Sequence, residues 1–379
     1  RIVSLDCDFA GTDPQGPVTP FFDRRKPEGK AYEKAPDASS MNRLYVVEAA
    51  YSLTGGMADH RLRLATSHML ALAAAIGGKA LGTDILKPFT EGLEAFVSQK
   101  WVDECAQDLL DHKGESLVVA GAHLPPQVHA IAYAINALLG NIGKTIDFVA
   151  VEASSAATLS DLAAAIKTGA VKTLVILGGN PVYNAPVDLD WAKLQASVSD
   201  VIRLGYAADE TSALAGTTLA SAHYLESWGD ARTADGTVVP VQPMILPLFG
   251  GITQLEVLAR IAGEANADGY AMVSETIAAL AGGDAEKAMR RFIHDGLLEG
   301  SAFKKVSVSF DQRGAQVLFR DEPKKVEAFS LKNLEVRFVT DHKMDDGRFK
   351  NNGWLQECPD PITKISWVNA ILLSPKLGK

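Results

Sequence analysis

Residues 174–181 read Leu174-Val175-Ile176-Leu177-Gly178-Gly179-Asn180-Pro181. The four apolar residues predict a short strand that is buried on both faces, as in a parallel sheet covered by helices. The glycines and the proline then end the strand in a tight turn. Ligands of open α/β sheets bind beyond the carboxyl ends of the strands, so Gly178, Gly179, Asn180 and Pro181 are candidate binding residues. The alternative is a βα turn whose glycines serve only its backbone angles.

Similar apolar runs recur along the chain and alternate with amphipathic patterns. The predicted strands are 2–5, 44–47, 117–120, 146–151, 173–177 and 201–204. The predicted helices are 68–76, 126–139, 159–167 and 253–262. This alternation indicates an α/β fold with mostly parallel sheets joined by right-handed crossovers.

Changes of pattern divide the chain into four parts. We expect one Rossmann-like domain over residues 1–113 and a second over 114–262. Residues 263–333 predict helices followed by β ribbon, and 334–379 predict an extended arm that ends in a strand at 367–375. The opening residues resemble the middle of a strand and no Met begins the chain. We therefore expect the chain to be a central fragment of a larger subunit.

Composition excludes several classes of protein. The 379 residues are 47% hydrophobic and 22% charged, which suits folded domains. A net charge of -9, with no basic run, argues against nucleic-acid binding. No apolar stretch is long enough to cross a bilayer. The cysteines Cys7, Cys105 and Cys358 are too far apart for a cluster motif and predict three free buried thiols, and no metal ligands are expected.

Two other strand ends carry polar candidates. Gly121 and His123 follow the strand at 117–120, and Asp209 and Thr211 follow the strand at 201–204. Each pair is a candidate for cofactor binding. The alternatives are a solvated histidine for His123 and capping of the next helix for Asp209 and Thr211.

Asp6 and Asp8 end the first strand, and a paired-carboxylate acid/base site is conceivable there. Because no other group in the sequence accompanies the two carboxylates, a structural or partner-contact role is favoured. No catalytic residue is predicted in the chain.

Several of these motifs follow one another in the order found in the molybdopterin oxidoreductase (DMSO reductase-like) family. The segment from Gly121 to Lys144, which includes Gly140-Asn141-Ile142-Gly143-Lys144, resembles the family stretch that ends in GNIGKPG. Leu177–Pro181, with Pro186, is similar to its GxNP loop. Asp209-Glu210-Thr211, His223–Asp230 and Asp235–Thr237 resemble a later conserved block. The resemblance covers about residues 1–262, and the order of motifs is more specific than any one of them.

One branch of the family is more similar than the rest. Met41–Glu48, Met57–Leu62, His223–Arg232 and Asn351–Glu357 look like the large iron–sulfur subunit of bacterial alternative complex III. That resemblance implies a region similar in fold to molybdenum enzymes but without a molybdenum cofactor. It also implies iron–sulfur clusters elsewhere in the subunit, other subunits of a membrane-bound respiratory complex as partners, and a peripheral location on the periplasmic face of the inner membrane.

Departures from the family pattern favour this branch. Where cofactor-binding members have Gly-Ala-Asn-Pro, the chain has Asp6-Cys7-Asp8-Phe9, and two carboxylates there would repel a pyrophosphate. Glu48-Ala49-Ala50 replaces the family Asp-Pro-Arg. We therefore predict a scaffold for electron transfer that binds no cofactor in this region. The alternative is a fragment of an active oxidoreductase that binds molybdopterin guanine dinucleotide through the residues named above.

Overall fold

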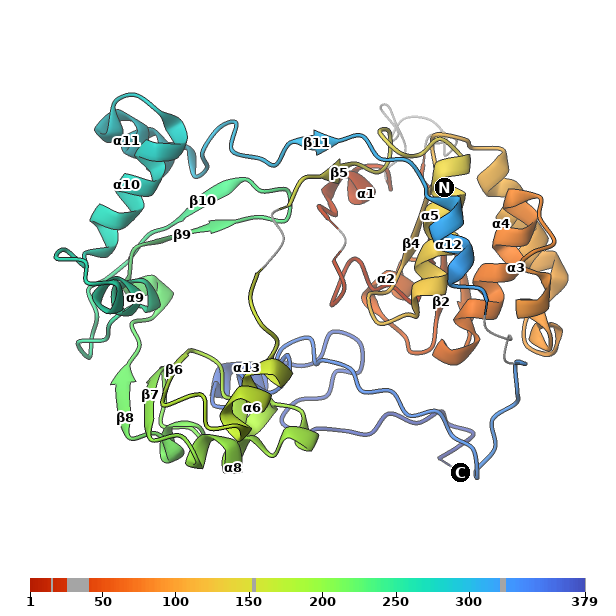
Figure 1. Cartoon of the computed structure of the whole chain (residues 1–379). Coiled ribbons are helices and arrows are strands. Elements are labelled where there is room, and N and C mark those ends of the chain that lie inside the picture. The colour runs from red at the N-terminus through yellow and green to blue at the C-terminus, as the bar shows by residue number, and fades with distance from the viewer. Residues whose placement is uncertain (15, 26–40, 152–154, 321–324, 379) are drawn as a thin grey trace. The chain divides into compact units, whose positions relative to one another are not determined.

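The computed structural model describes residues 1–379 except 15, 26–40, 152–154, 321–324 and 379 (Figure 1). The chain forms two compact units. The first unit comprises Arg1–Phe148, Lys305–Asp345 and Asn352–Lys379, and the second comprises Val149–Lys304 and Asp346–Asn351. Between the first two strands of the chain, the described residues include the short helix α1 (Thr19–Asp23).

A parallel four-stranded sheet forms the centre of the first unit. Its strands are β1 (Ile2–Leu5), β2 (Leu44–Glu48), β3 (His60–Arg63) and β4 (Leu117–Ala120), in the order β3-β2-β1-β4. The direction of the chain connections along the sheet reverses between β1 and β4, so the carboxyl ends of these two strands form the switch point of the sheet. Residue 114, the predicted start of a second domain, precedes β4, and β4 pairs with β1 in this first sheet.

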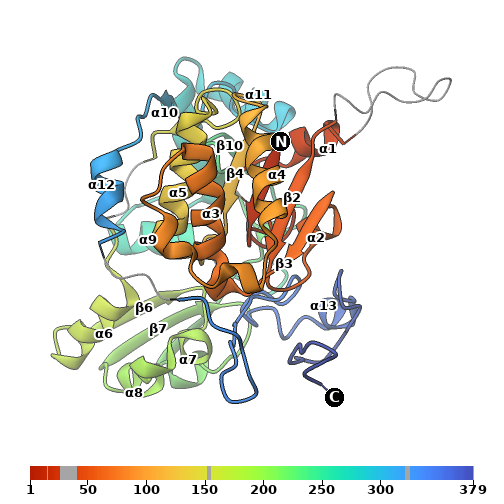
Figure 2. The ribbon, with the colours of Figure 1, turned by 90° about the vertical axis from the view of Figure 1, so that its right-hand side faces the viewer.

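Helices cover both faces of this sheet. On one face lie α3 (Met69–Leu81), α4 (Gln99–Leu110) and α5 (Pro126–Leu138), which appear together in front of the strands in Figure 2. On the other face lie α1 and α2 (Leu53–Gly56). Side chains along β2 alternate between the two cores, because Tyr45 and Val47 pack with α3 to α5 whereas Leu44 and Val46 pack near Phe21. Each fully buried aliphatic side chain contributes about 1.5–3 kcal/mol.

The second unit contains a smaller parallel sheet. Its strands are β6 (Thr173–Leu177), β7 (Asp200–Gly205) and β8 (Thr217–Ala220), in that order. The helices α6 (Leu159–Lys167), α7 (Pro181–Asn184) and α8 (Trp191–Ala196) accompany it. Thr158 begins α6 with a capping box that includes Asp161, as expected for a helix start. The core of this part is Ala163, Ile166, Leu174, Trp191, Leu194, Val198 and Val201.

The rest of the second unit is a hairpin packed with helices. The antiparallel strands β9 (Gly229–Arg232) and β10 (Val238–Val241) are followed by α9 (Gln254–Ala262), α10 (Gly269–Ala281) and α11 (Ala285–Asp295). Val238, Val273, Ile277, Met289 and Phe292 form their core. The helices predicted within 263–303 are therefore present.

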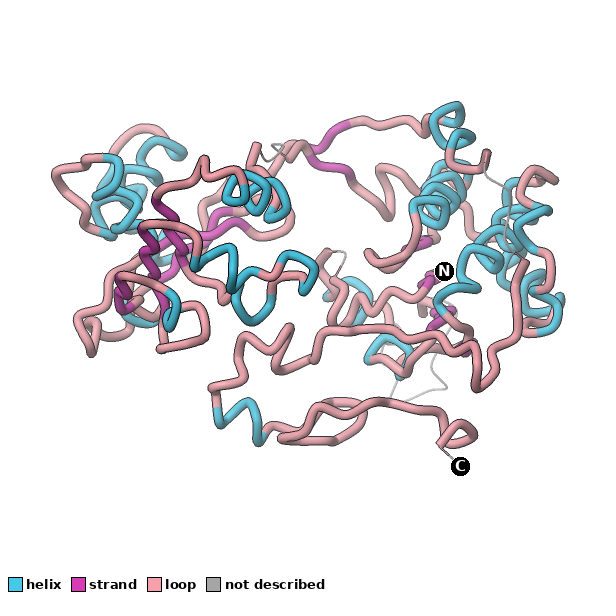
Figure 3. The backbone as a smooth tube through the Cα atoms, turned by 60° about the horizontal axis from the view of Figure 1, so that its bottom comes forward, coloured by secondary structure: helices cyan, strands magenta, loops and turns pink. Residues whose placement is uncertain are grey.

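The later part of the chain corrects two predictions of β structure. Between 304 and 340 the described strand is β11 (Lys305–Val306), and α12 (Gln312–Val317) is a helix where β ribbon was expected. The strand expected at 367–375 is wrong, because those residues are loop in Figure 3. The arm also holds the short helix α13 (Gly353–Glu357), and the strand predicted at 146–151 is reduced to β5 (Phe148–Val149).

The described part of the chain also contains short 3-10 helices. They are η1 (Thr66–His68), η2 (Lys87–Thr90), η3 (Leu93–Ala95), η4 (Val187–Leu189), η5 (Ser212–Leu214) and η6 (Tyr224–Glu226). The predicted α/β class with parallel sheets is confirmed. Among the residues that the structure describes, none of the helices has the length and apolar character needed to cross a membrane.

Candidate functional site

The switch point of the first sheet is occupied by Asp6. This residue follows β1 with a φ of 48°, in the left-handed region, and its side chain is buried. Its Oδ2 accepts a hydrogen bond from the Thr66 hydroxyl at 2.7 Å and lies 3.1 Å from Nε2 of His123. Arg337 donates to Oδ1 at 3.0 Å and to Oδ2 at 2.9 Å. The carboxylate is therefore fully engaged inside the first unit.

The predicted residues Gly121 and His123 lie beside Asp6. The Gly121 amide donates to the Leu5 carbonyl oxygen at 2.9 Å, and a Cβ at Gly121 would lie 2.3 Å from the Asp6 carbonyl oxygen. The glycine thus allows two backbone segments to approach closely. His123 is exposed to solvent, as its alternative role predicted, and its ring also contacts Asp6.

Asp8 and Glu48 are also bonded within the first unit. Asp8 accepts from the Thr54 amide at 2.9 Å and from the Thr54 hydroxyl at 2.8 Å. Burial raises the pKa of Asp8, but the hydrogen bonds from Thr54 outweigh it and hold that pKa below its usual value. Glu48 is buried and accepts from Arg61 and Ser52, both at 2.5 Å. The two aspartates have different partners, so they form no paired acid/base site.

The prediction of free, buried thiols is confirmed for two of the three cysteines. Cys7 and Cys105 are buried and free, and burial raises the pKa of each thiol. Cys358 is free but exposed, so its predicted burial is wrong. Within the described ranges, no group of three or more His, Cys, Asp or Glu side chains is arranged to hold a metal ion.

In the second unit, the Arg203 side chain bonds to the candidate loop that follows β6. Gly178 and Gly179 have φ angles of 71° and 64°, the left-handed region that favours glycine. Arg203, on β7, is buried and donates to the Gly178 carbonyl oxygen at 2.9 Å and to the Gly179 carbonyl oxygen at 2.5 Å. It also pairs with Asp209 at 2.9 Å. Burial raises the pKa of Asp209, yet hydrogen bonds from Arg203 and Ser212 bring it below its usual value.

Asn180 joins this loop to the segment after β7. Its Oδ1 accepts from the Thr211 hydroxyl at 2.6 Å and from the Thr211 amide at 3.2 Å, and its Nδ2 donates to Glu210 at 2.7 Å. The Thr211 hydroxyl in turn accepts from the Val182 amide at 3.1 Å. Asp209 accepts from the Ser212 amide at 2.8 Å at the start of the short helix η5 (Ser212–Leu214). Thr211 occupies the N-cap position but makes no side-chain capping bond, so the predicted capping role is met by Asp209 alone. The structure brings Gly178, Gly179, Asn180, Pro181, Asp209 and Thr211 together.

A short segment of the C-terminal arm binds to the same loop. Lys350 pairs with Glu210 at 2.5 Å, and its Nζ lies 3.7 Å from the ring centroid of Tyr183 on α7. The hydrogen bond from Lys350, together with that from Asn180, lowers the pKa of Glu210 to about 2. Asn184 donates to Asp346 at 2.9 Å.

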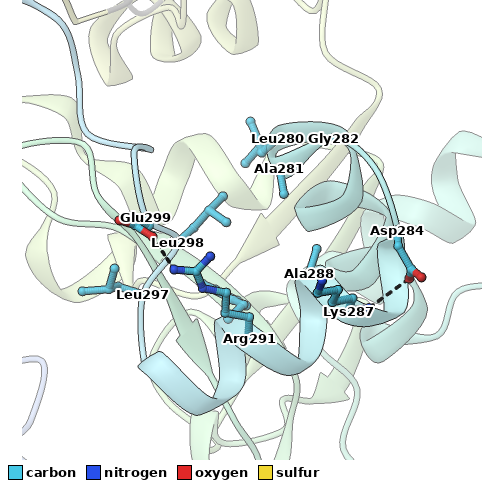
Figure 4. A pocket seen from close by; sticks show the side chains of 11 residues that line it. Leu280, Ala281, Gly282, Asp284, Lys287, Ala288, Arg291, Leu297, Leu298 and Glu299 are labelled. Carbon is cyan, nitrogen blue, oxygen red and sulfur yellow. Dashed lines mark hydrogen bonds and ion pairs between the residues drawn. The ribbon is translucent and has the colours of Figure 1, made fainter.

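The second unit also has a pocket of about 380 Å³, which lies away from these loops. It is formed around α10 and α11, and Figure 4 shows its lining side chains. Its cationic Arg291 is bonded to Glu299 and Asp295, so its charge is already matched. None of the predicted site residues lines this pocket.

Three residues that organise these sites were not predicted as site residues. The sequence does contain a sign of the role of Arg203, because a cation inside an otherwise apolar strand must have buried partners. Arg337 and Lys350 lie in segments without periodicity, and nothing in their local sequence indicates partners at a strand end.

Comparisons with known proteins do not show which family this chain belongs to. No family model matches the sequence, and no curated protein matches it. Among solved structures, the chain is similar to acetylene hydratase from Pelobacter acetylenicus. The identity is 13% and the TM-score 0.45, with 69% of this chain and 47% of that chain covered. This chain therefore spans about half the length of that protein.

Proposed function

We propose that the chain is the molybdopterin-oxidoreductase-like region of a respiratory electron-transfer subunit, and that it serves as a structural scaffold without catalysis of its own. The proposal combines the order of sequence motifs with one structural observation. That observation is that the candidate cofactor loop, Gly178 to Pro181, already uses its polar groups in bonds within its own unit.

The residues present do not fit a molybdopterin guanine dinucleotide. A dinucleotide site needs free donors at the strand ends to hold the pyrophosphate. Here the Asn180 amide donates to Glu210, and Arg203 is bonded to two carbonyl oxygens and Asp209. To bind phosphate, these groups would have to give up partners that they hold in low-dielectric surroundings.

Charge argues in the same direction. The strand ends carry the carboxylates of Asp6 and Asp8 in the first unit and of Asp209 and Glu210 in the second. The hydrogen bonds that lower the pKa values of Asp8, Asp209 and Glu210 keep these groups ionised at neutral pH. Asp6, Asp209 and Glu210 each pair with a cation, so a pyrophosphate would have to compete with these carboxylates for Arg337, Arg203 and Lys350.

The remaining elements of the proposal come from the family resemblance alone. They are iron–sulfur clusters elsewhere in the full subunit, partner subunits of a membrane-bound respiratory complex, and a position on the periplasmic face of the inner membrane. In that setting the region would hold other parts of the complex in place while electrons pass through the clusters.

Metal and pterin analysis of the full-length protein, purified from its native host, tests the proposal. Iron without molybdenum, tungsten or pterin is the expected result. Stoichiometric molybdenum or tungsten together with a fluorescent pterin would overturn it, and would favour an active molybdopterin guanine dinucleotide-dependent oxidoreductase.

A second test uses the substitution Asn180→Ala in the parent complex. We expect assembly and turnover to remain close to wild type, because the Asn180 side chain is already bonded to Glu210 and Thr211 of its own unit. Asn266→Ala, at an exposed position of the second unit, is the matched control. Loss of turnover in an intact complex carrying Asn180→Ala, but not Asn266→Ala, would contradict the scaffold role.

A further inference from the structure

Between residues 334 and 338 of the arm, the apolar side chains are exposed and the charged side chains contact the rest of the first unit. Leu334, Val336 and Phe338 are exposed, with 72% of Val336 and 94% of Phe338 accessible to solvent. The residues between them, Glu335 and Arg337, make the contacts with the rest of the first unit. The arm is therefore held by polar contacts, since burial of apolar surface cannot account for its position.

Glu335 binds the backbone at the start of η1. Its Oε1 accepts from the Thr66 amide at 3.0 Å and its Oε2 accepts from the Ser67 amide at 3.1 Å. Both amides precede α3, so they lack carbonyl partners of the regular helical pattern. The Thr66 hydroxyl also donates to Asp6, so Glu335 acts next to the switch point of the sheet.

Arg337 contacts the side chains at the switch point directly. Its Nη1 bonds both oxygens of Asp6, and its Nη2 lies 3.5 Å from Nδ1 of His123. The Asp6 side chain is almost fully buried, whereas that of Arg337 remains 30% exposed. Arg337 brings a full positive charge from the arm to Asp6. Because the Arg337 side chain is partly exposed, ions in the solvent can reach this ion pair.

His342 provides a third point of attachment. Its Nδ1 lies 3.2 Å from Asp360 and its Nε2 lies 3.6 Å from Asp8, so the ring sits between two carboxylates. Upstream, the arm is held by packing, because the Phe329 ring stacks on His68 with centroids 5.1 Å apart. The polar contacts thus begin where the packed part of the arm ends.

We propose that residues 335–342 form a releasable electrostatic strap that closes the carboxyl edge of the first sheet. When closed, the strap covers Asp6, contacts His123 and blocks access of other ligands to the Asp6 carboxylate. Because its contacts are ionic and partly exposed, high ionic strength weakens them, whereas an arm held by apolar packing would be unaffected or strengthened. Release would free the Thr66 and Ser67 amides and leave the packed part of the arm in place.

Hydrogen exchange on the full chain tests the strap. We expect Glu335→Ala and Arg337→Gln each to accelerate exchange of the Thr66 and Ser67 amides by about tenfold or more, as loss of a charge-assisted hydrogen bond implies. Chymotryptic cleavage after Phe338 should increase in parallel. Glu357→Gln and Lys332→Gln remove exposed charges from the same arm and serve as matched controls.

A salt titration of the unsubstituted protein provides a test that does not depend on the variants folding. Raising NaCl to about 1 M, where the screening length is near 3 Å, should accelerate exchange at Thr66 and Ser67 but not at core amides such as Leu72. If neither the two variants nor salt changes exchange at these amides, the strap is refuted. Cofactor content plays no part in this measurement, so its outcome is separate from that of the proposed scaffold function.

Discussion

A Cβ atom on Gly121 would lie 2.3 Å from the carbonyl oxygen of Asp6. Both residues follow neighbouring parallel strands, and the contact brings their backbones together at the switch point. Because the obstacle is backbone, it cannot rotate away. Gly121→Ala should therefore destabilise the first unit by about 1–3 kcal/mol, as overpacking does.

Urea denaturation of the full chain measures this effect. Gly353→Ala is the control, since a Cβ there meets no atom within 4 Å. Equal stability of the two variants would mean that the close approach of Gly121 to Asp6 is not a constraint.

Arg203→Lys should destabilise the second unit, although charge is kept. Lysine has a single ammonium group and cannot bond the Gly178 and Gly179 carbonyl oxygens and Asp209 at once. Arg203→Met leaves Asp209 without its ion-pair partner, and we expect a loss of about 3–5 kcal/mol. Lys193→Met, at an exposed ion pair, should leave the unfolding midpoint unchanged. A tolerated Arg203→Met would show that the loop does not depend on this side chain.

Lys350→Met should raise the pKa of Glu210 from about 2 toward its ordinary value of 4.5. The hydrogen bond from Lys350 is the largest cause of the depression, and the bond from Asn180 would remain. A depressed carboxyl pKa gives stability that is present above the unfolded-state pKa and is lost as the pH falls toward the folded-state pKa. The window therefore lies between about pH 4.5 and pH 2.

Carbon NMR of the Glu210 side-chain carboxyl group follows this titration directly. Lys287→Met, at another lysine of the second unit, controls for the change in net charge. An unchanged Glu210 titration in Lys350→Met would contradict the pairing of residues 346–351 with this loop.

His68 should make the first unit less stable in mild acid. Burial lowers its pKa, against smaller opposing effects from Glu327 and Glu335. Its ring lies between Phe96 and Phe329. The unfolded chain then binds the proton more readily, so stability falls as the pH drops below about 6.5, the unfolded-state pKa.

The substitution His68→Phe keeps an aromatic ring in this place and removes the titrating group. We expect it to flatten the dependence of unfolding free energy on pH between about 7 and 5. The same exchange at His294, whose side chain is 88% exposed, is the control. A slope that persists in His68→Phe would have to come from another group.

The sequence predicted best those elements whose apolar runs are bounded by turn residues. Ile2–Leu5, Leu117–Ala120 and Thr173–Leu177 are strands with the expected bounds, and Leu159–Lys167 is a helix with the expected bounds. Ile2–Leu5 is buried almost throughout, so burial and propensity act in the same direction there. Thr173–Leu177 is a strand as predicted, but Leu174 is its one buried residue, so its predicted burial on both faces is wrong.

The β ribbon expected after residue 304 failed for a physical reason. Residues 306–310 alternate Val and Ser, which is a strand pattern, but a strand also needs a partner for its backbone groups. Within residues 305–310, all of which the structure describes, strand geometry is limited to Lys305 and Val306. Val317 ends α12, and residues 318 and 319 form the turn that follows it.

At the sites, the sequence identified which strand ends matter but not what fills them. Gly121, His123, Asn180 and Thr211 all lie at carboxyl ends of strands, as expected. Arg337 contacts His123, Lys350 pairs with Glu210 and Arg203 bonds Gly178, and each cation lies at least 25 residues from its partner along the chain. A spacing rule cannot predict such distant pairings.

The order in which the two units occur along the chain has a consequence for synthesis. Residues 149–304 form most of the second unit and are continuous, whereas the first unit is completed by segments that follow them. A ribosome adds about 5–20 residues per second, so the sheet of the first unit is made well before Phe329 and Arg337 emerge to cover it. The nascent first unit therefore lacks the contacts of Phe329 and Arg337 during the time in which residues 149–304 are made.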